Sequence, residues 1–203
     1  MPATFPSTFI PIVGAYLNLP TEGKTEEETA EMIASQYHLA VTTANTSLHA
    51  NMPFVQAPYA PIKAAVLKTL MDIKESEGKA KLIHFKDWAI ATSAYWLSTT
   101  MSPVPFHPVN MALSTATFGI PTPIVHIINN GGNIPALQAA LLLAFSDEPS
   151  PVLYGIPFAT KLALAFTNHL KTVRGIQTEL VFPGSVLTPL PPFPSPQPWV
   201  GMV

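Results

Sequence analysis

The sequence predicts a mainly α-helical protein of about five helices, with short β or extended elements and proline-rich terminal arms. Apolar residues recur at helical spacing in several stretches of the chain. Charged residues make up only 11% of the sequence, whereas about 25% is usual for soluble domains. Proline makes up 23 of the 203 residues. Because proline ends helices, we expect extended segments between them.

We divide the chain into an N-terminal arm (1–21), a helical domain (22–182) and a C-terminal arm (183–203). The first arm contains no charged residue and four prolines, and proline biases the residue before it toward extended conformations. An extended arm is therefore predicted, and its many apolar side chains indicate that it docks against a surface. The last 17 residues, 187–203, contain six prolines and no charge. Such a run favours polyproline II, which is preorganised for docking.

The helical domain is expected to begin at Thr25, where T-E-E-E forms a capping box before a helix that runs to about residue 50. A second helix should follow Pro61, because proline is favoured in the first turn, and should end near Gly78. Three further helices are predicted at residues 79–99, 133–145 and 157–174.

Two short strands are expected among these helices. Residues 124–128 (IVHII) precede Asn-Asn-Gly-Gly and fit a strand followed by a turn. Residues 176–182 alternate in part and could form a second strand.

Residues 79–108 and 152–182 are weakly similar, which indicates either an internal repeat or the chance similarity of two amphipathic helices. Three identical pairs align without gaps: Phe85 with Phe158, Leu97 with Leu170, and Thr99 with Thr172.

Both repeated helices are rich in alanine and lead into an extended segment marked by proline or glycine. In this they resemble small virion structural proteins of tailed bacteriophages. The matching residues are FKDWAIATSAYWLSTTMSPVP (85–105) and FATKLALAFTNHLKTVRG (158–175). The resemblance implies a non-enzymatic subunit that repeats in a symmetric tail, neck or baseplate assembly, with arms over its neighbours. The chain departs from the small versions in its N-terminal half and its proline-rich end, which leaves its place in the particle open.

No catalytic or metal-binding pattern stands out, so we expect neither a metal nor another cofactor. Cysteine is absent, and the six histidines do not show metal-ligand spacing. His84 and Asp87 are expected to form a surface pair, and His126 to be a core histidine bonded to a backbone carbonyl. Residues 129–133 (NNGGN) are expected to be a plain loop-to-helix turn. An enzyme that uses His84 or His126 is the alternative.

Charge and hydropathy limit the partners. The formal net charge is −2 and basic residues are interleaved with acidic ones, so we expect neither nucleic acid nor a membrane as a partner. The N-terminus lacks a signal-peptide pattern, and no apolar run is long enough to span a bilayer. The expected location is the virion, after synthesis in the host cytoplasm.

The low charge predicts a protein that completes its surface with copies of itself and other virion structural proteins. Residues 88–146 contain no Asp, Glu, Lys or Arg, and large apolar surfaces mark interaction sites. The alternative is an adaptor whose tail presents P-x-x-P at 189–192 and 191–194 to a partner. The predicted interface residues are Phe5, Phe9, Tyr16, Phe106, Phe118, Phe193 and Trp199.

Overall fold

The computed structural model describes residues 3–19, 24–42, 54–55, 57–101, 124–146, 155–179 and 197–200. Over these residues the protein is mainly helical, which confirms the predicted fold class. The helical elements are the π-helical turn η1 (Phe5–Phe9), α1 (Ile10–Asn18), α2 (Glu26–Val41), α3 (Ala60–Glu75), the 3-10 turn η2 (Leu82–Phe85), α4 (Lys86–Leu97), α6 (Ile134–Ser146) and α7 (Gly155–Leu170).

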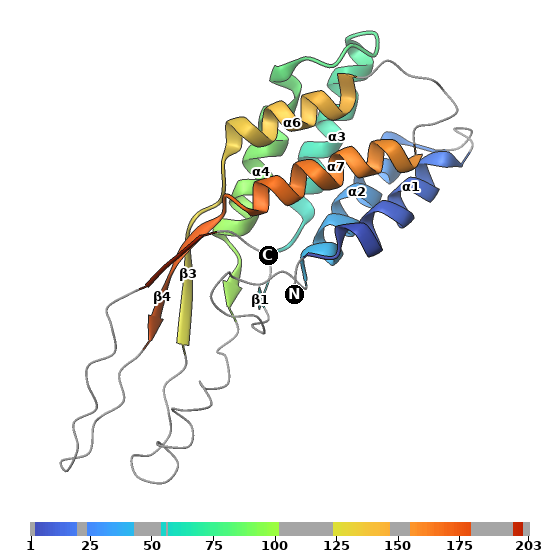
Figure 1. The fold of residues 1–203 in the computed structure, drawn as a ribbon. Helices are drawn as coiled ribbons and strands as arrows, with labels where there is room; N and C mark the ends of the chain where they lie inside the picture. The colour runs from blue at the N-terminus through green and yellow to red at the C-terminus, as the bar shows by residue number, and fades with distance from the viewer. Residues whose placement is uncertain are drawn as a thin grey trace, which may run out of the picture.

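The helices form two layers (Figure 1). One layer contains α6, α7 and α1, which run side by side, and the other contains α4, α3 and α2. Contacts between α4 and α6 join the layers along one edge, and contacts of η1 and α1 with α2 join them along the other. The hydrophobic core lies between the layers.

The helix boundaries follow from local sequence. Thr25 accepts a hydrogen bond from the Glu28 backbone N–H, and the Glu28 carboxylate accepts one from Thr25 N–H, so the predicted capping box is present. Helix α3 has a proline in its first turn, where proline costs no helical hydrogen bond. It ends before Glu77 and Gly78, which have φ angles of 56° and 77°. Helix α2 ends at Val41, and residues 43–50 of the longer helix predicted there lie outside the described residues.

The N-terminal segment is helical, whereas an extended arm was expected. Pro6 and Pro11 each occupy the first turn of a helical element, which is the position where proline is compatible with a helix. The start of η1 is joined to the end of α2 by a hydrogen bond from Thr4 N–H to the Ala40 carbonyl, at 2.9 Å. The prolines in this segment therefore begin helices and do not extend the chain.

An aromatic cluster fills the core, and Phe166 of α7 lies at its centre. The Phe166 ring centroid lies 4.7 Å from that of Tyr37, 5.8 Å from Phe5, 5.6 Å from Phe9 and 6.2 Å from Trp88. All five side chains are at most 1% exposed. Phe166 thus connects η1, α2 and α4 to α7.

Two polar contacts pair α2 with α4 beside this cluster. Trp96 Nε1 donates a hydrogen bond to Tyr37 Oη, and Tyr95 Oη lies 2.8 Å from His38 Nδ1. Adjacent residues on each helix therefore find polar partners on the other. Tyr37 and Trp96 are fully buried, so an indole N–H or phenol oxygen without a hydrogen-bond partner would destabilise the fold. The hydrogen bond between them satisfies both groups.

A three-stranded antiparallel sheet projects from one end of the helical body (Figure 1). It consists of β3 (Ile124–Asn130), β4 (Arg174–Glu179) and β5 (Gln197–Val200), in the order β3-β4-β5. Ile124 pairs with Glu179 at the end of the sheet, and Arg174 pairs with Val200 next to the helices. A smaller sheet pairs β1 (Phe54–Val55) with β2 (Thr100–Met101).

Three predictions concern segments around these strands. The strand expected at 124–128 is part of β3, and residues 176–179 of the strand expected at 176–182 belong to β4, whereas residues 180–182 lie outside the described residues. Helices α4 and α7 are each followed by a strand, but this order does not test the internal repeat, which stays a prediction. Most of the C-terminal arm lies outside the described residues, and its residues 197–200 form β5.

We expect Phe166→Ala to lower the free energy of unfolding by about 3–5 kcal/mol, because it removes a buried ring that contacts four other rings. Leu164→Ala, two residues away and 60% exposed in the wild type, should change it by at most about 0.5 kcal/mol. Urea denaturation followed by circular dichroism measures both. Equal effects of the two substitutions would contradict the central position of Phe166.

Candidate functional site

The structure places the predicted interface residues in three different situations. Phe5 and Phe9 are buried in the core of their own chain, so they cannot contact a neighbour, and the prediction for them is corrected. Their burial follows from the helical form of the segment, which turns both rings toward Phe166. Tyr16 is partly buried in a groove, described below. Trp199 belongs to β5, and Phe106, Phe118 and Phe193 lie outside the described residues.

Of the two histidines singled out in the sequence, His84 lies in η2 and His126 on β3. His84 Nε2 lies 3.5 Å from Ser76 Oγ, and His84 Nδ1 accepts a weak hydrogen bond from the Lys81 N–H. Asp87 pairs with Lys68 on α3, so the expected pair of His84 and Asp87 is not formed. His126 lies on β3 opposite Gln177.

Three hydrogen bonds tie the loop of residues 131–133 to its neighbours. Asn133 Oδ1 accepts a hydrogen bond from Ala136 N–H at the start of α6, and Asn133 N–H donates to Thr172 Oγ1. Asn130 Oδ1 accepts from Gly132 N–H. These bonds describe a loop-to-helix turn, as predicted.

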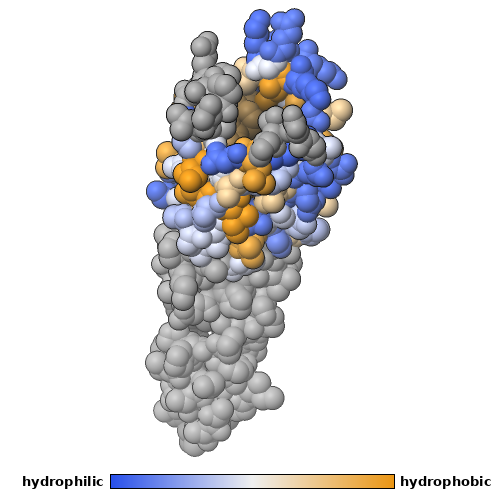
Figure 2. All heavy atoms as spheres, turned by 90° about the vertical axis from the view of Figure 1, so that its right-hand side faces the viewer, coloured by the Kyte–Doolittle hydropathy of each residue, from blue (hydrophilic) through white to orange (hydrophobic). Residues whose placement is uncertain are grey.

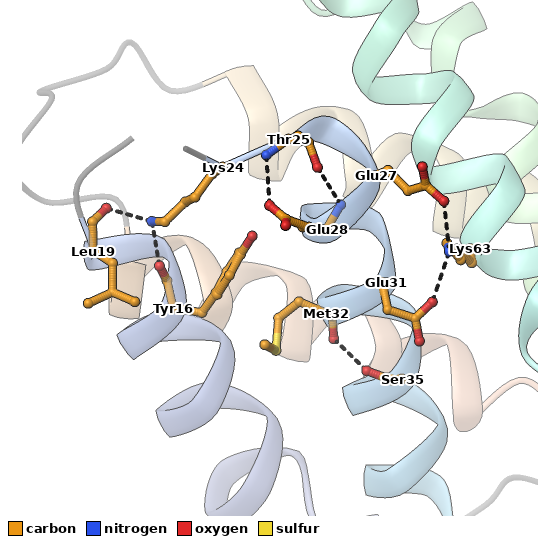
Figure 3. Close-up of a pocket in the computed structure, with 10 residues that line it drawn as sticks. All are labelled: Tyr16, Leu19, Lys24, Thr25, Glu27, Glu28, Glu31, Met32, Ser35 and Lys63. Carbon is orange, nitrogen blue, oxygen red and sulfur yellow. Dashed lines mark hydrogen bonds and ion pairs between the residues drawn. The ribbon is translucent and has the colours of Figure 1, made fainter. Parts of the chain in front are cut away.

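A groove of about 1000 Å³ lies between α1 and α2 and ends at Lys63 of α3 (Figure 3). Lys24 Nζ donates hydrogen bonds to the carbonyls of Tyr16 and Leu19, at 2.6 and 2.5 Å, and lies over the Tyr16 ring. A positive charge at these last carbonyls of α1 also complements the helix dipole. On the other side of the groove, Lys63 pairs with Glu27 and Glu31, each at 3.2 Å.

Each charged group of this groove therefore already has a partner within the chain. A hydrogen bond from Tyr59 Oη is the main cause that lowers the pKa of Glu31. Glu28 belongs to the capping box, and Tyr16 Oη is buried without a hydrogen-bond partner in the described part of the chain. The groups join α1, α2 and α3 together, which favours a structural role for the groove over substrate binding.

A buried histidine lies where the large sheet meets the helices. His169, in the last turn of α7, is 3% exposed, and a Cβ on Gly132 would lie 2.4 Å from its Nε2. Neither ring nitrogen makes a hydrogen bond of good geometry to a described residue. Burial lowers the pKa of His169 from its ordinary 6.5 to about 4, and the nearby backbone of Gly131 opposes that shift. The sequence carried no signal for this contact, since Gly132 and His169 are far apart in the chain.

We expect His169 to make the protein less stable as the pH falls from about 6.5 toward 4. Its folded-state pKa is the lower one, so the unfolded chain binds more protons in this window and the free energy of unfolding falls, by at most about 1.4 kcal/mol per pH unit. Urea denaturation between about pH 7 and 5 should therefore give a shallower pH dependence for His169→Gln than for the wild type.

Burial also lowers the pKa of His38. His38 therefore contributes to the pH dependence of stability in the same way in the wild type and in His169→Gln. The difference between the two profiles therefore reports on His169. Two parallel profiles would show that His169 does not contribute.

The outer side of the α6–α7–α1 layer is apolar, and we call it the apolar face. Helices α1 and α6 contain no charged residue, and Lys161 is the one charged residue of α7. Four large side chains project from it: Ile12 is 41% exposed, Ile156 52%, Leu164 60% and Leu143 68%. Smaller exposed residues lie between them, namely Ala15, Ala136, Ala139 and Thr160.

Close contact between two backbones makes this face continuous from α1 to α7. A Cβ on Gly155 would lie 2.1 Å from the Gly14 carbonyl oxygen, and Gly155 N–H donates to Asn18 Oδ1 at 3.0 Å. A Cβ on Gly14 would lie 2.9 Å from Ile156 Cγ1. Only glycine fits at these two positions without displacing a neighbour, so the two helices touch without a gap.

The other layer carries the charge. Ion pairs of Lys63 with Glu27 and Glu31, of Lys68 with Asp87, and of Lys74 with Glu26 connect α2, α3 and α4. Figure 2 looks onto the end of the helical body: the strongest blue lies at the top and along the right edge, and orange atoms lie in the middle and on the left. The side that Figure 1 presents to the viewer lies at the left of Figure 2. The two layers therefore differ in charge, although the second layer also exposes large apolar side chains, namely Leu39, Met71, Ile90 and Leu97, at 42–51%.

Searches against protein-family models, curated proteins and solved structures found no match to this chain. Across the described ranges, no three His, Asp or Glu side chains are grouped to hold a metal ion. None of the helices in those ranges has both the length and the apolar character needed to cross a lipid bilayer. The apolar face is thus the feature of the described residues that most directly suggests a function.

Proposed function

We propose that this protein is a non-enzymatic structural subunit of a multimeric assembly, and that the apolar face is one of its contact surfaces. The observation that carries the proposal is the exposure of Ile12, Ile156, Leu164 and Leu143 on three adjacent helices that bear almost no charge. Apolar surface of this kind is buried in interfaces, because removal from water stabilises it by about 25 cal/mol per Å².

The charged layer supports the same proposal from the opposite side. Its ion pairs join neighbouring helices and leave their side chains partly in water, which suits a surface that stays solvated in the assembly. A subunit with one solvated layer and one apolar face can occupy a defined orientation against its neighbours.

The resemblance of α4 and α7 to virion structural proteins of tailed bacteriophages suggests which assembly this is. We propose a tail, neck or baseplate component whose partners are copies of itself and other virion structural proteins. It would be made in the host cytoplasm and reside in the particle. Electron microscopy of the assembled wild-type protein should then show rings or tubes of regular repeat.

We expect the purified wild-type protein to form a discrete oligomer or a polymer whose native mass rises with concentration. Because the apolar face carries almost no charge, raising the salt from about 0.1 to 0.5 M, which shortens the Debye length from about 10 to 4 Å, should leave the mass unchanged or raise it. Static light scattering over a concentration series at both salt levels measures this.

A mass that falls with added salt would indicate contacts through the charged layer and contradict the role of the apolar face. A monomer at every concentration would sink the proposal of self-assembly and favour the adaptor with a P-x-x-P tail. Deleting residues 187–203 is not a clean test, because it also removes β5 and uncovers the edge of β4.

A further inference from the structure

We propose that the apolar face of one subunit receives residues 180–196 of a second copy of this chain, in a head-to-tail contact. This inference rests on the assembly function proposed above and names the partner of the apolar face.

The apolar face selects an uncharged partner. Around Leu164 and Ile156 it offers no carboxylate, and Lys161 is the one ammonium group on its three helices. A cationic side chain pressed against this face, or an anionic one away from Lys161, would lose its hydration without gaining a partner, which costs several kcal/mol. The occupant should therefore be an apolar segment with very few charges.

This chain contains such a segment. Residues 180–196 read LVFPGSVLTPLPPFPSP, without any charged residue and with six prolines. Proline restricts the unbound chain, so a proline-rich segment loses less conformational entropy on docking than a flexible one. Its apolar side chains, Phe193 among them, match the apolar face in character.

The sheet fixes where this segment leaves the protein. It follows Glu179, which pairs with Ile124 at the end of β3 and β4 that lies away from the helices (Figure 1). It returns to Gln197, which pairs with Gln177. Both ends are thus held at the projecting end of the sheet.

The segment is too short to cover the apolar face of its own subunit. Both of its ends are held at the sheet, so the segment must run out and return. At about 3.1 Å per residue its turning point can lie at most about 25 Å from the sheet. Strand β3 alone has seven residues and separates the far end of the sheet from the helices by about 20 Å. From Leu170 at the end of α7, Leu164 lies about 9 Å and Ile156 about 21 Å further along the helix. Leu164 and Ile156 therefore lie about 29 and 41 Å from the far end of the sheet, so the part of the apolar face around them would receive the segment of another copy.

A contact between two different surfaces of one chain has a structural consequence. Each subunit offers one apolar face and one segment, so every bound copy leaves a face and a segment free for the next. Such heterologous contacts produce closed rings or helical filaments, whereas a contact of one face with itself stops at a dimer.

The test uses three full-length variants. Leu164→Lys places a charge on the apolar face, and Phe193→Asp places one in the segment. Met71→Lys is the matched control, because Met71 is 49% exposed but lies on α3 in the charged layer. Leu164 and Met71 lie outside the core cluster, and Phe193 lies outside the described residues. Circular dichroism with thermal denaturation tests whether each variant is folded.

We expect each of Leu164→Lys and Phe193→Asp to raise the apparent dissociation constant of assembly at least about tenfold, and Met71→Lys to assemble like the wild type. An equimolar mixture of the two defective variants should form a dimer and nothing larger. In that mixture, the intact face of the Phe193→Asp chain binds the intact segment of the Leu164→Lys chain. Sedimentation velocity measures the masses.

Two outcomes would overturn the inference while leaving the proposed function intact. In one, Phe193→Asp assembles like the wild type, so the apolar face binds something other than the segment. In the other, both variants are defective and their mixture stays monomeric. A wild-type protein that is monomeric throughout would overturn the proposed function together with this inference.

Discussion

The packing of Phe166 is the constraint on which the rest of the structure depends. Four rings from η1, α2 and α4 surround it, so the two helical layers and the N-terminal segment share one contact point. Because these rings come from distant parts of the chain, local helix propensity alone cannot bring them together. The burial of aromatic surface, together with the bond between Trp96 and Tyr37, holds the layers in register and thereby places α1, α7 and α6 side by side.

Much of the helical architecture was predictable, because five of the helices follow from capping, periodicity and proline position. The prediction of an extended N-terminal segment was wrong because it took proline as a sign of extended chain. Pro6 and Pro11 instead occupy first turns, where proline fits a helix. Phe5 and Phe9 were then assigned to an interface. Once the segment is a helix, their spacing puts both rings on the side that faces the core.

The apolar face could be predicted only in part. Low charge indicated that some surface is shared with other chains, but sequence alone does not tell which helices lie side by side. The contact between Gly14 and Gly155 and the burial of His169 against Gly132 depend on the packing of segments far apart in the chain, and no local pattern announces them. The P-x-x-P motifs and three of the predicted interface aromatics lie outside the described residues.

The contact between α1 and α7 has a consequence for the order of events during synthesis. Gly155 leaves the ribosome 137 residues after its partner Asn18, which at about 5–20 residues per second takes on the order of ten seconds. Until then the N-terminal helix has no α7 to pack against, and the apolar face does not exist. A nascent chain therefore cannot bind finished subunits through this face until α7 has been made.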